Sequence, residues 1–260
     1  MAKPFIYIAA VRRSGSKLLS MLLTRPPDSL ILREPGLVRD KFRLKEQEIE
    51  VLEEQGITFS RPLDKTAAVR GEQAWQVFFE EVLPTLQARF KQVGIKEIWH
   101  DRSLELLERL GDTRIVVTAR DPRDIYLSLH RNREKFAAMG RQKARLPGGF
   151  NPESVAAHLN TQFAQQRFML DQLGAIGVRY EDLCANPDEQ FRRVSEHVES
   201  PIQTPSLVNK TGNLGGVFGE TINTARVYTW KREDDSDLLE KAQETASLMP
   251  AYLAYWDYED

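Results

Sequence analysis

Residues 5–23, FIYIAAVRRSGSKLLSMLL, join an apolar run to a helical pattern through a short basic turn. A continuous apolar run of this kind is typical of a strand that is buried on both faces, as in parallel sheets. The apolar spacing that follows predicts a helix over Lys17–Leu23. A strand, a Ser-Gly turn and a helix in this order begin a βαβ unit, so the segment indicates an α/β fold.

The rest of the chain continues this alternation. Further strands are predicted at Ser29–Leu32, Ile95–His100, Thr113–Arg120 and Ala175–Leu183, the last running into a turn. Helices are predicted at Leu37–Gln55, Glu72–Val93, Leu104–Leu110, Asp124–Met139, Glu153–Leu173, Pro187–Val198 and Ser236–Leu248. We therefore expect one α/β domain over residues 1–260, with a mostly parallel central sheet flanked by helices.

Composition excludes several classes of function. The 36 Lys and Arg residues against 38 Asp and Glu residues give a net charge of −2, which argues against general nucleic-acid binding. The single cysteine, Cys184, excludes an intramolecular disulfide and a multi-cysteine metal site. The apolar run Phe5–Val11 is too short to span a membrane and lacks a cleavage pattern, so we expect a cytoplasmic protein. No pattern indicates an oligomeric state.

The turn after the first strand has the makings of an anion site. A Ser-Gly turn that leads into a helix directs backbone N–H groups and the positive end of the helix dipole at one point, where phosphate commonly binds. The nucleotide triphosphate loop G-x-x-x-x-G-K-[ST] is not reproduced, because Ala10 replaces its first glycine and Lys17 comes one place late. A phosphotransferase or nucleotide hydrolase that uses Mg²⁺ and a degenerate loop is an alternative reading.

The same turn resembles the 5′-phosphosulfate loop of the sulfotransferases that use 3′-phosphoadenosine 5′-phosphosulfate (PAPS). In that family a basic residue precedes Ser-Gly-Ser/Thr, here Arg13, Ser14, Gly15 and Ser16. Two residues depart from the pattern: Arg12 stands where the family usually has Pro, and Lys17 where it usually has Thr. The resemblance implies a P-loop-type fold in which residues 13–17 bind the donor.

Two later motifs resemble the same family. In ARDPRDIYLSLHR, Arg120 and Ser128 have the spacing of the pair that binds the donor's 3′-phosphate, and in VRYEDL the place of Tyr180 implies contact with adenine. Arg120 ends a predicted core strand, where α/β sheets bind ligands, and a guanidinium forms charge-assisted bonds with phosphate. An alternative is that Arg120 only pairs with its neighbours and that Tyr180 is a core aromatic residue. The resemblance covers about residues 5–187, and TARVYTWKRE (224–233) is similar to a segment near the family's end.

The resemblance also implies catalytic residues. Arg13 takes the place of the basic residue at the leaving group, and its role is electrostatic because guanidinium keeps its proton. Glu34 matches in position the base of the protein-tyrosine sulfotransferases, whereas His100 lies at the strand end that supplies the base in cytosolic members. We place Glu34 ahead of His100. The other histidines, His130, His158 and His197, fall on predicted helices and have no assigned role.

The expected function is transfer of a sulfuryl group from PAPS to a hydroxyl or amine of a small molecule or peptide, by in-line displacement with a carboxylate base. The product nucleotide is adenosine 3′,5′-bisphosphate (PAP), and no metal is expected. A non-catalytic module that keeps only the donor site is a further alternative. The basic loop Gly140–Pro152 is a candidate lid or an ordinary solvated loop, and the Gly-rich segment Lys210–Gly219 is a candidate donor contact.

Overall fold

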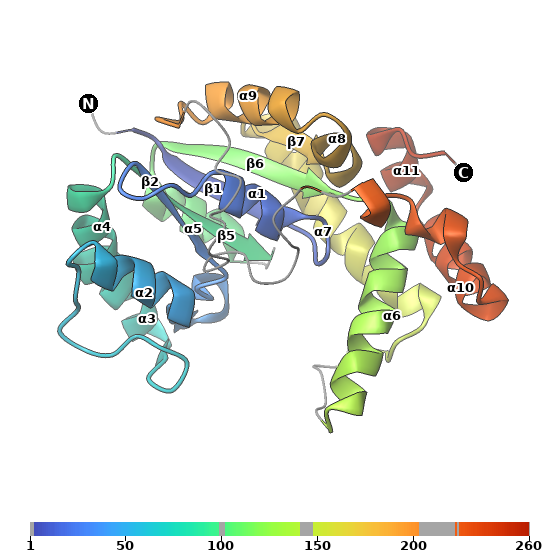
Figure 1. Ribbon diagram of the computed structural model, residues 1–260, viewed down its shortest axis with the longest axis horizontal. Helices are drawn as coiled ribbons and strands as arrows, with labels where there is room; N and C mark the ends of the chain where they lie inside the picture. Colours follow the sequence, from blue (N-terminus) through green and yellow to red (C-terminus); the bar gives the residue numbers. More distant parts are fainter. Residues whose placement is uncertain (1–2, 99–101, 141–147, 203–221, 223, 260) are drawn as a thin grey trace.

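The computed structural model describes residues 3–98, 102–140, 148–202, 222 and 224–259. Five parallel strands form the central sheet in the order β2-β5-β1-β6-β7 (Figure 1). Their bounds are Phe5–Ala10 for β1, Ser29–Arg33 for β2, Gln92–Ile98 for β5, Thr113–Ala119 for β6 and Ile176–Arg179 for β7. The predicted α/β fold with a mostly parallel sheet is confirmed.

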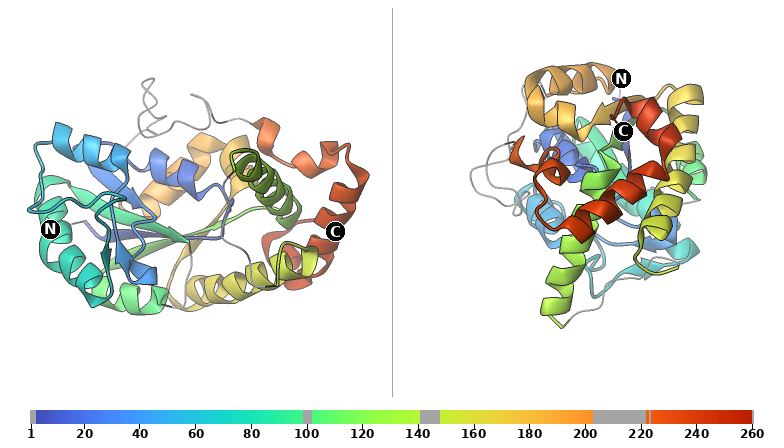
Figure 2. Two further views of the ribbon diagram at one scale, coloured as in Figure 1. Left: turned by 90° about the horizontal axis from the view of Figure 1, so that it is seen from below. Right: turned by 90° about the vertical axis from the view of Figure 1, so that its right-hand side faces the viewer.

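Helices cover both faces of the sheet (Figure 2). On one face of the sheet, the core includes α1 (Ser16–Leu22), α8 (Tyr180–Ala185) and α9 (Pro187–His197). The other core includes α4 (Leu83–Arg89), α5 (Ser103–Leu110), α6 (Pro122–Ala138), α7 (Pro152–Gln172), α10 (Ser236–Ser247) and α11 (Pro250–Trp256). No helix in these described ranges is long and apolar enough to cross a membrane.

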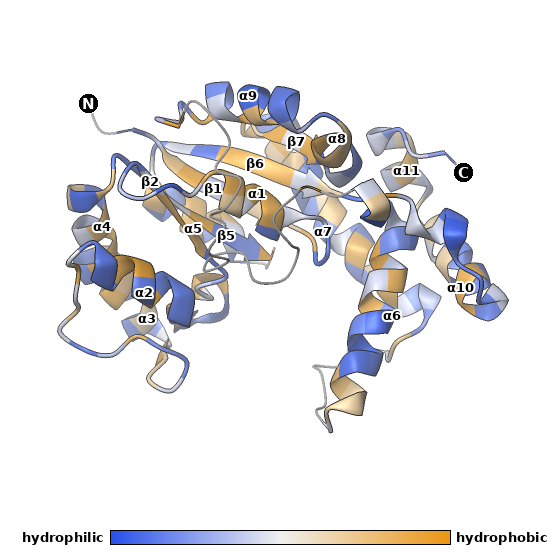
Figure 3. Cartoon of the chain, viewed as in Figure 1, coloured by the Kyte–Doolittle hydropathy of each residue, from blue (hydrophilic) through white to orange (hydrophobic). Residues whose placement is uncertain are grey.

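The first strand is the centre of the sheet because it is apolar on both faces. All six residues of β1 are buried; Ile6 and Ile8 pack toward α1, and Tyr7 and Ala9 pack toward the opposite helices. Figure 3 shows the same concentration of apolar residues on β1 and β6 and the polar outer surfaces of α6 and α10. Period-two alternation thus divides one continuous apolar run between two cores.

The predicted helix over Leu37–Gln55 is wrong in its first half. A short 3-10 turn, η1 (Leu37–Arg39), leads into β3 (Lys41–Phe42), which pairs with β4 (Val69–Arg70), and α2 begins only at Glu46 and ends at Glu54. Gly36 and Asp40 have φ values of 97° and 50°, and both left-handed residues break the helical path. The side chain of Glu48 then closes the start of α2 by accepting from the Lys45 amide.

The predicted helix over Glu72–Val93 is also too long. It consists of α3 (Glu72–Gln76), the π-helical turn η2 (Val77–Val82) and α4, and it ends at Arg89. The strand that follows begins at Gln92, three residues before the predicted start, and the side chain of Gln92 donates to the carbonyls of Pro4 and Val198. Val93, the last residue of the predicted helix, therefore belongs to β5.

The carboxyl end of the chain differs from the prediction in two places. Strand β7 ends at Arg179, and Tyr180 is the first residue of α8 instead of a strand residue. An additional helix, α11, follows the predicted terminal helix. Pro250 in its first turn starts this helix, and the buried side chains of Tyr252 and Trp256 lie on one face at helical spacing.

The strand order places a topological switch point between β1 and β6, where α/β sheets commonly have a ligand-binding crevice. The chain leaves β1 toward β2 on one side of the sheet, and it crosses from β5 over β1 to β6 and then β7 on the other side. Neighbouring strands whose connections run in opposite directions leave a gap at their carboxyl ends, and ligands bind there in open α/β sheets. The loop after β1 and the residue after β6, Arg120, meet at this gap.

Candidate active site

The loop after β1 is held in a conformation that only a glycine fits at its centre. Gly15 has a φ of 78°, and a Cβ atom at this position would lie 2.2 Å from Cδ2 of Tyr180. Ser14 fixes the preceding turn: its hydroxyl donates to the Val11 carbonyl at 2.8 Å and lies 2.6 Å from the hydroxyl of Thr118 on β6. The Ser14 side chain is thus turned inward, and the loop offers its backbone to the crevice.

Replacing Gly15 by Ala is expected to destabilise the fold more than a glycine-to-alanine change elsewhere. A non-glycine residue at positive φ costs about 1–3 kcal/mol, and at Gly15 the contact with Tyr180 adds displacement of the ring. Gly56→Ala is the matched control, since Gly56 has a φ of 70° and no atom within 4 Å of its added Cβ. Urea unfolding of both variants measures the difference; equal losses would show that Tyr180 does not constrain the loop.

Arg120 forms the opposite wall of the crevice. Its backbone is fixed by Tyr252, whose hydroxyl accepts from the Arg120 amide at 3.1 Å and donates to the Arg120 carbonyl at 2.9 Å. Its guanidinium lies 4.5 Å from the ring of Tyr180 and donates to the Arg13 carbonyl at 3.2 Å, to Asp124 at 3.2 Å and to the Arg226 carbonyl at 2.7 Å. The Nε atom is buried and has no hydrogen-bond partner in the described chain.

Positive charge converges on the loop. Arg13 donates from Nε to the hydroxyl of Ser128 at 2.7 Å, which joins two predicted donor residues that lie 115 positions apart. Burial lowers the pKa of Arg13, and the nearby charges of Arg120 and Arg226 lower it further. Three guanidinium groups at one point repel one another, and a polyanion relieves that repulsion.

A second layer of polar contacts positions these groups. Asp124, which is fully buried, pairs with Arg120 and accepts from the hydroxyl of Thr229 at 2.7 Å and from the Trp230 amide at 3.1 Å. Asp121 caps α6 by accepting from the Arg123 amide at 2.9 Å. Arg120 therefore does form an ion pair with a neighbour, as the alternative predicted. This pair orients the guanidinium and leaves its buried Nε without a hydrogen bond.

Glu34 lies at the carboxyl end of β2, beside the same loop. Its amide donates to the Lys96 carbonyl at 2.6 Å, and its carboxylate forms an ion pair with the Lys96 ammonium. Burial raises the pKa of Glu34, but the charges of Lys96, Lys45 and Arg39 outweigh that effect and lower it to about 2. The carboxylate is therefore ionised at neutral pH.

A second carboxylate, Glu97, sits on the opposite face of β5. It is 1% exposed, and its Oε1 accepts from the Gly36 amide at 2.7 Å. Burial raises its pKa to about 7; the hydrogen bond from Gly36 opposes this rise, and the negative charge of Glu34 adds to it. Sequence reasoning missed Glu97 because it lies inside a strand, where a single acidic residue carries no motif.

The structure brings most of the predicted site together. The residues that meet here are those of the loop (13–17) together with Arg120, Ser128 and Tyr180. Glu34 lies close enough to influence the pKa of Arg13. His100, the basic loop 141–147 and the segment 210–219 lie outside the described residues. Arg226 was not predicted, although its place in the segment TARVYTWKRE is a signal that would have found it.

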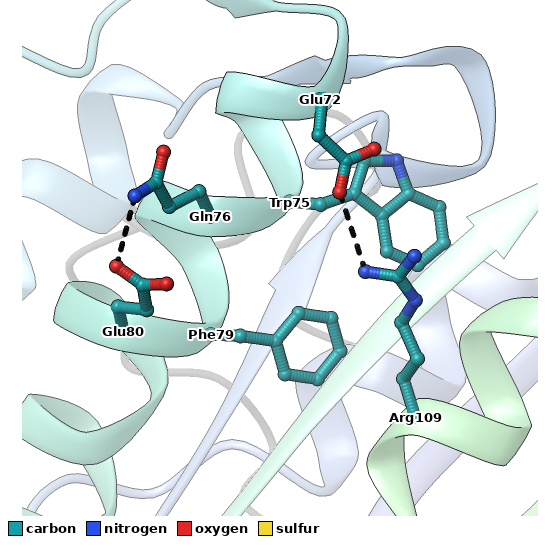
Figure 4. Close-up of a pocket in the computed structure, with 6 residues that line it drawn as sticks. All are labelled: Glu72, Trp75, Gln76, Phe79, Glu80 and Arg109. Atoms are coloured by element: carbon teal, nitrogen blue, oxygen red, sulfur yellow. Dashed lines mark hydrogen bonds and ion pairs between the residues drawn. The ribbon is translucent and has the colours of Figure 1, made fainter.

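A separate pocket of about 410 Å³ lies between α3, η2 and α5. Figure 4 shows that Trp75 and Phe79 form its apolar wall and that Arg109 points toward Glu72, 3.6 Å away. None of the residues that line this pocket belongs to the loop after β1 or to the ends of β1 and β6. No group of three or more His, Cys, Asp or Glu residues within the described ranges has the arrangement of a metal site.

Comparison with known proteins assigns the family. The sequence profile of the Sulfotransferase family matches residues 4–204. The chain belongs to this family. Its fold matches the sulfotransferase domain from the curacin biosynthetic pathway, with a TM-score of 0.61, 15% identity and coverage of 99% of this chain and 98% of the other. It also matches a sulfotransferase from Alicyclobacillus acidocaldarius, with a TM-score of 0.56, 16% identity and coverage of 100% and 98%.

No curated protein sequence matches the chain. At identities of 15% and 16% the structural matches show the fold alone. The activity is assigned from the family profile. The chain is thus a sulfotransferase, in keeping with the resemblance seen in its three motifs. The phosphotransferase reading, which rested on a degenerate triphosphate loop, loses its basis.

Proposed function

We propose that this sulfotransferase uses PAPS as its donor and transfers the sulfuryl group to a hydroxyl or amine of a small molecule or peptide. The observation that carries the proposal is the convergence of Arg13, Arg120 and Arg226 on the crevice between β1 and β6. A nucleotide with a 3′-phosphate and a 5′-phosphosulfate supplies negative charge at two points. The guanidinium of Arg120 is suited to one of these anions, because it forms charge-assisted hydrogen bonds with phosphate.

The family's motif positions distribute the roles. Arg120 and Ser128 bind the 3′-phosphate, Tyr180 contacts the adenine, and residues 13–17 bind the 5′-phosphosulfate. When bound, PAPS supplies the sulfuryl group. Arg13 stabilises the negative charge that develops on the leaving phosphate, and it does so without giving up a proton.

The acceptor is activated by Glu34. The carboxylate takes the proton from the attacking hydroxyl or amine as the new bond to sulfur forms and the bond from sulfur to the bridging oxygen breaks. Lys96 holds the carboxylate in place through the ion pair. Positioning and electrostatic stabilisation supply most of the rate in such in-line displacements, and the crevice provides both.

Calorimetric titration with PAP, beside ATP with Mg²⁺, tests the donor. We expect PAP to bind at least 100-fold more tightly than ATP, because Arg120 and Ser128 recognise a 3′-phosphate that ATP lacks. Tight ATP binding with no PAP binding would contradict the proposal. Release of labelled sulfate from PAPS to an acceptor mixture separates a transferase from a module that only binds the nucleotide.

The affinity for PAP is expected to fall with rising pH. Burial, together with the positive charges of Arg33, Lys45, Lys96 and Arg13, lowers the pKa of Lys17 to about 8. Lys17 is protonated below this pH and loses its charge above it, so the dissociation constant should rise about tenfold between pH 7 and pH 9. Lys17→Arg keeps the positive charge over this pH range, so the dissociation constant of the variant should change little between pH 7 and pH 9. A slope that persists in the variant would assign the titration to another group.

A further inference from the structure

A second group of basic side chains lies near the loop, and the donor does not account for it. The group consists of Arg12, Arg39 and His158, and we call it the acceptor-side cluster. Arg12 precedes the donor loop residue Arg13, and His158 belongs to α7, which packs on the face of the sheet opposite α1. Neither Arg12 nor Arg39 forms an ion pair with any residue that the structure describes.

Hydrogen bonds and strand register place the elements that carry these residues around the end of β1. Gln166 of α7 donates to the carbonyl of Ala9 at 3.5 Å and to that of Thr118 at 3.3 Å, so α7 lies across the ends of β1 and β6. Ala9 is paired with Glu97 in the sheet. The carboxylate of Glu97 accepts from the amide of Gly36, three residues before Arg39. The turn η1 and helix α7 thus flank the end of β1, from which Arg12 extends.

The side of α7 that faces this point carries unsatisfied polar atoms. His158, Gln162 and Gln166 are spaced four residues apart and share one helix face. The Nε2 atom of His158 and the Oε1 atoms of both glutamines are buried without a partner in the described chain, and Gln162 is 3% exposed. Arg12 adds a buried, unpartnered Nε. Buried polar atoms without partners usually mark a site that water or a ligand fills.

The cluster is electrostatically positive. Burial lowers the pKa of His158, and the charges of Arg12 and Arg39 lower it further. Burial likewise lowers the pKa of Arg12, and so does the charge of Arg39. Two carboxylates act on the cluster, Glu34 on Arg12 and Glu97 on Arg39, but each already has another partner: Glu34 is paired with Lys96, and Glu97 accepts from the Gly36 amide. An oxyanion placed beside Arg12 and Arg39 relieves the repulsion between these two cations.

We propose that the acceptor-side cluster binds an oxyanion carried by the acceptor, so that this sulfotransferase modifies a molecule that is already anionic. The inference rests on the proposed function, because it takes the crevice between β1 and β6 as the donor site. Glu34 lies near both sites, because its charge acts on Arg13 of the donor loop and on Arg12 of the cluster. An anion bound by the cluster therefore places the rest of the acceptor beside the base. The unpartnered oxygen of Gln162 can accept a hydrogen bond from a hydroxyl of the same molecule.

Titration of His158 followed by nuclear magnetic resonance tests the cluster without knowledge of the acceptor. The imidazole signal, assigned with His158→Asn, is measured in PAP-saturated protein with sodium sulfate or sodium acetate, against sodium chloride at equal ionic strength. We expect a saturable rise of about one unit in the His158 pKa with at least one oxyanion. Arg39→Gln should weaken this binding at least tenfold, whereas Arg70→Gln, a change on an exposed strand residue, should leave it unaltered.

Two variants, Arg39→Gln and Arg120→Ala, separate this inference from the donor proposal. Oxyanion binding that is lost in Arg39→Gln but kept in Arg120→Ala belongs to the cluster, whereas the opposite pattern assigns it to the donor site and overturns the inference. PAP binding is measured on the same samples, so a failure of the donor proposal is seen independently.

A kinetic comparison then distinguishes a bound acceptor from a free ion. It uses pairs of acceptors that differ only in carrying a carboxylate or a carboxamide. The carboxylate member should have a KM at least tenfold lower, and Arg39→Gln should remove that difference; equal use of both members would overturn the acceptor assignment.

Discussion

Arg120→Ala is expected to weaken PAP binding by roughly 100- to 1,000-fold, the equivalent of about 3–4 kcal/mol for truncating one side of a buried, charge-assisted contact. Arg120 is 8% exposed, and the hydroxyl of Tyr252 forms hydrogen bonds with both its amide and its carbonyl. Its Nε is the unpartnered donor in the crevice. Calorimetric titration with PAP measures the effect directly.

Two further variants separate binding from folding. Arg120→Ala also leaves Asp124 without its ion pair, so some loss of thermal stability is expected. Arg120→Lys keeps the charge but not the planar fork, and its affinity should fall between those of the wild type and the alanine variant. Arg114→Ala, at the start of β6 and far from its carboxyl end, is the matched control and should bind PAP normally. Unchanged binding in Arg120→Ala would show that the 3′-phosphate site lies elsewhere.

The sequence predicted the sheet better than the segments around it. Strands such as Phe5–Ala10 and Thr113–Ala119 are buried on both faces, so their apolar runs carry the signal within the strand itself. The error over Leu37–Gln55 arose because the charged residues there fit a helix in composition. The observed β3–β4 pairing depends on Val69, a partner 27 residues beyond Phe42 that no local pattern reveals.

The site shows the same division. Arg13, Ser128 and Arg120 could be predicted because a motif fixes each of them locally, and the fold brings them together. Lys96 and Glu97 could not, because their importance comes from contacts across strands: Lys96 meets Glu34 from β5, and Glu97 holds the turn after β2. A strand residue whose partner lies some 60 positions away leaves no pattern in the sequence.

Glu34→Gln is expected to lower kcat by about 100- to 10,000-fold, the usual contribution of a general base, while PAP affinity changes little. The substitution keeps the shape of the side chain but removes its ability to accept the proton and its ion pair with Lys96, so thermal unfolding is measured beside kcat. Because the pKa of Glu34 is about 2, the wild-type carboxylate stays ionised from neutral pH down to the acid range. Its own titration should therefore produce no fall in kcat between pH 7 and pH 4.

The two rival bases make this prediction decisive. Glu97 has a pKa of about 7, so a base at that position would give a kcat that falls as the pH drops below neutrality. Glu97→Gln and His100→Asn are compared with Glu34→Gln in transfer of labelled sulfate from PAPS. A larger loss in Glu97→Gln, together with an acid limb near pH 7 that this variant abolishes, would move the base to Glu97. A dominant loss in His100→Asn would assign the role to the histidine, and a loss confined to Glu34→Gln supports the carboxylate that Lys96 holds beside the loop.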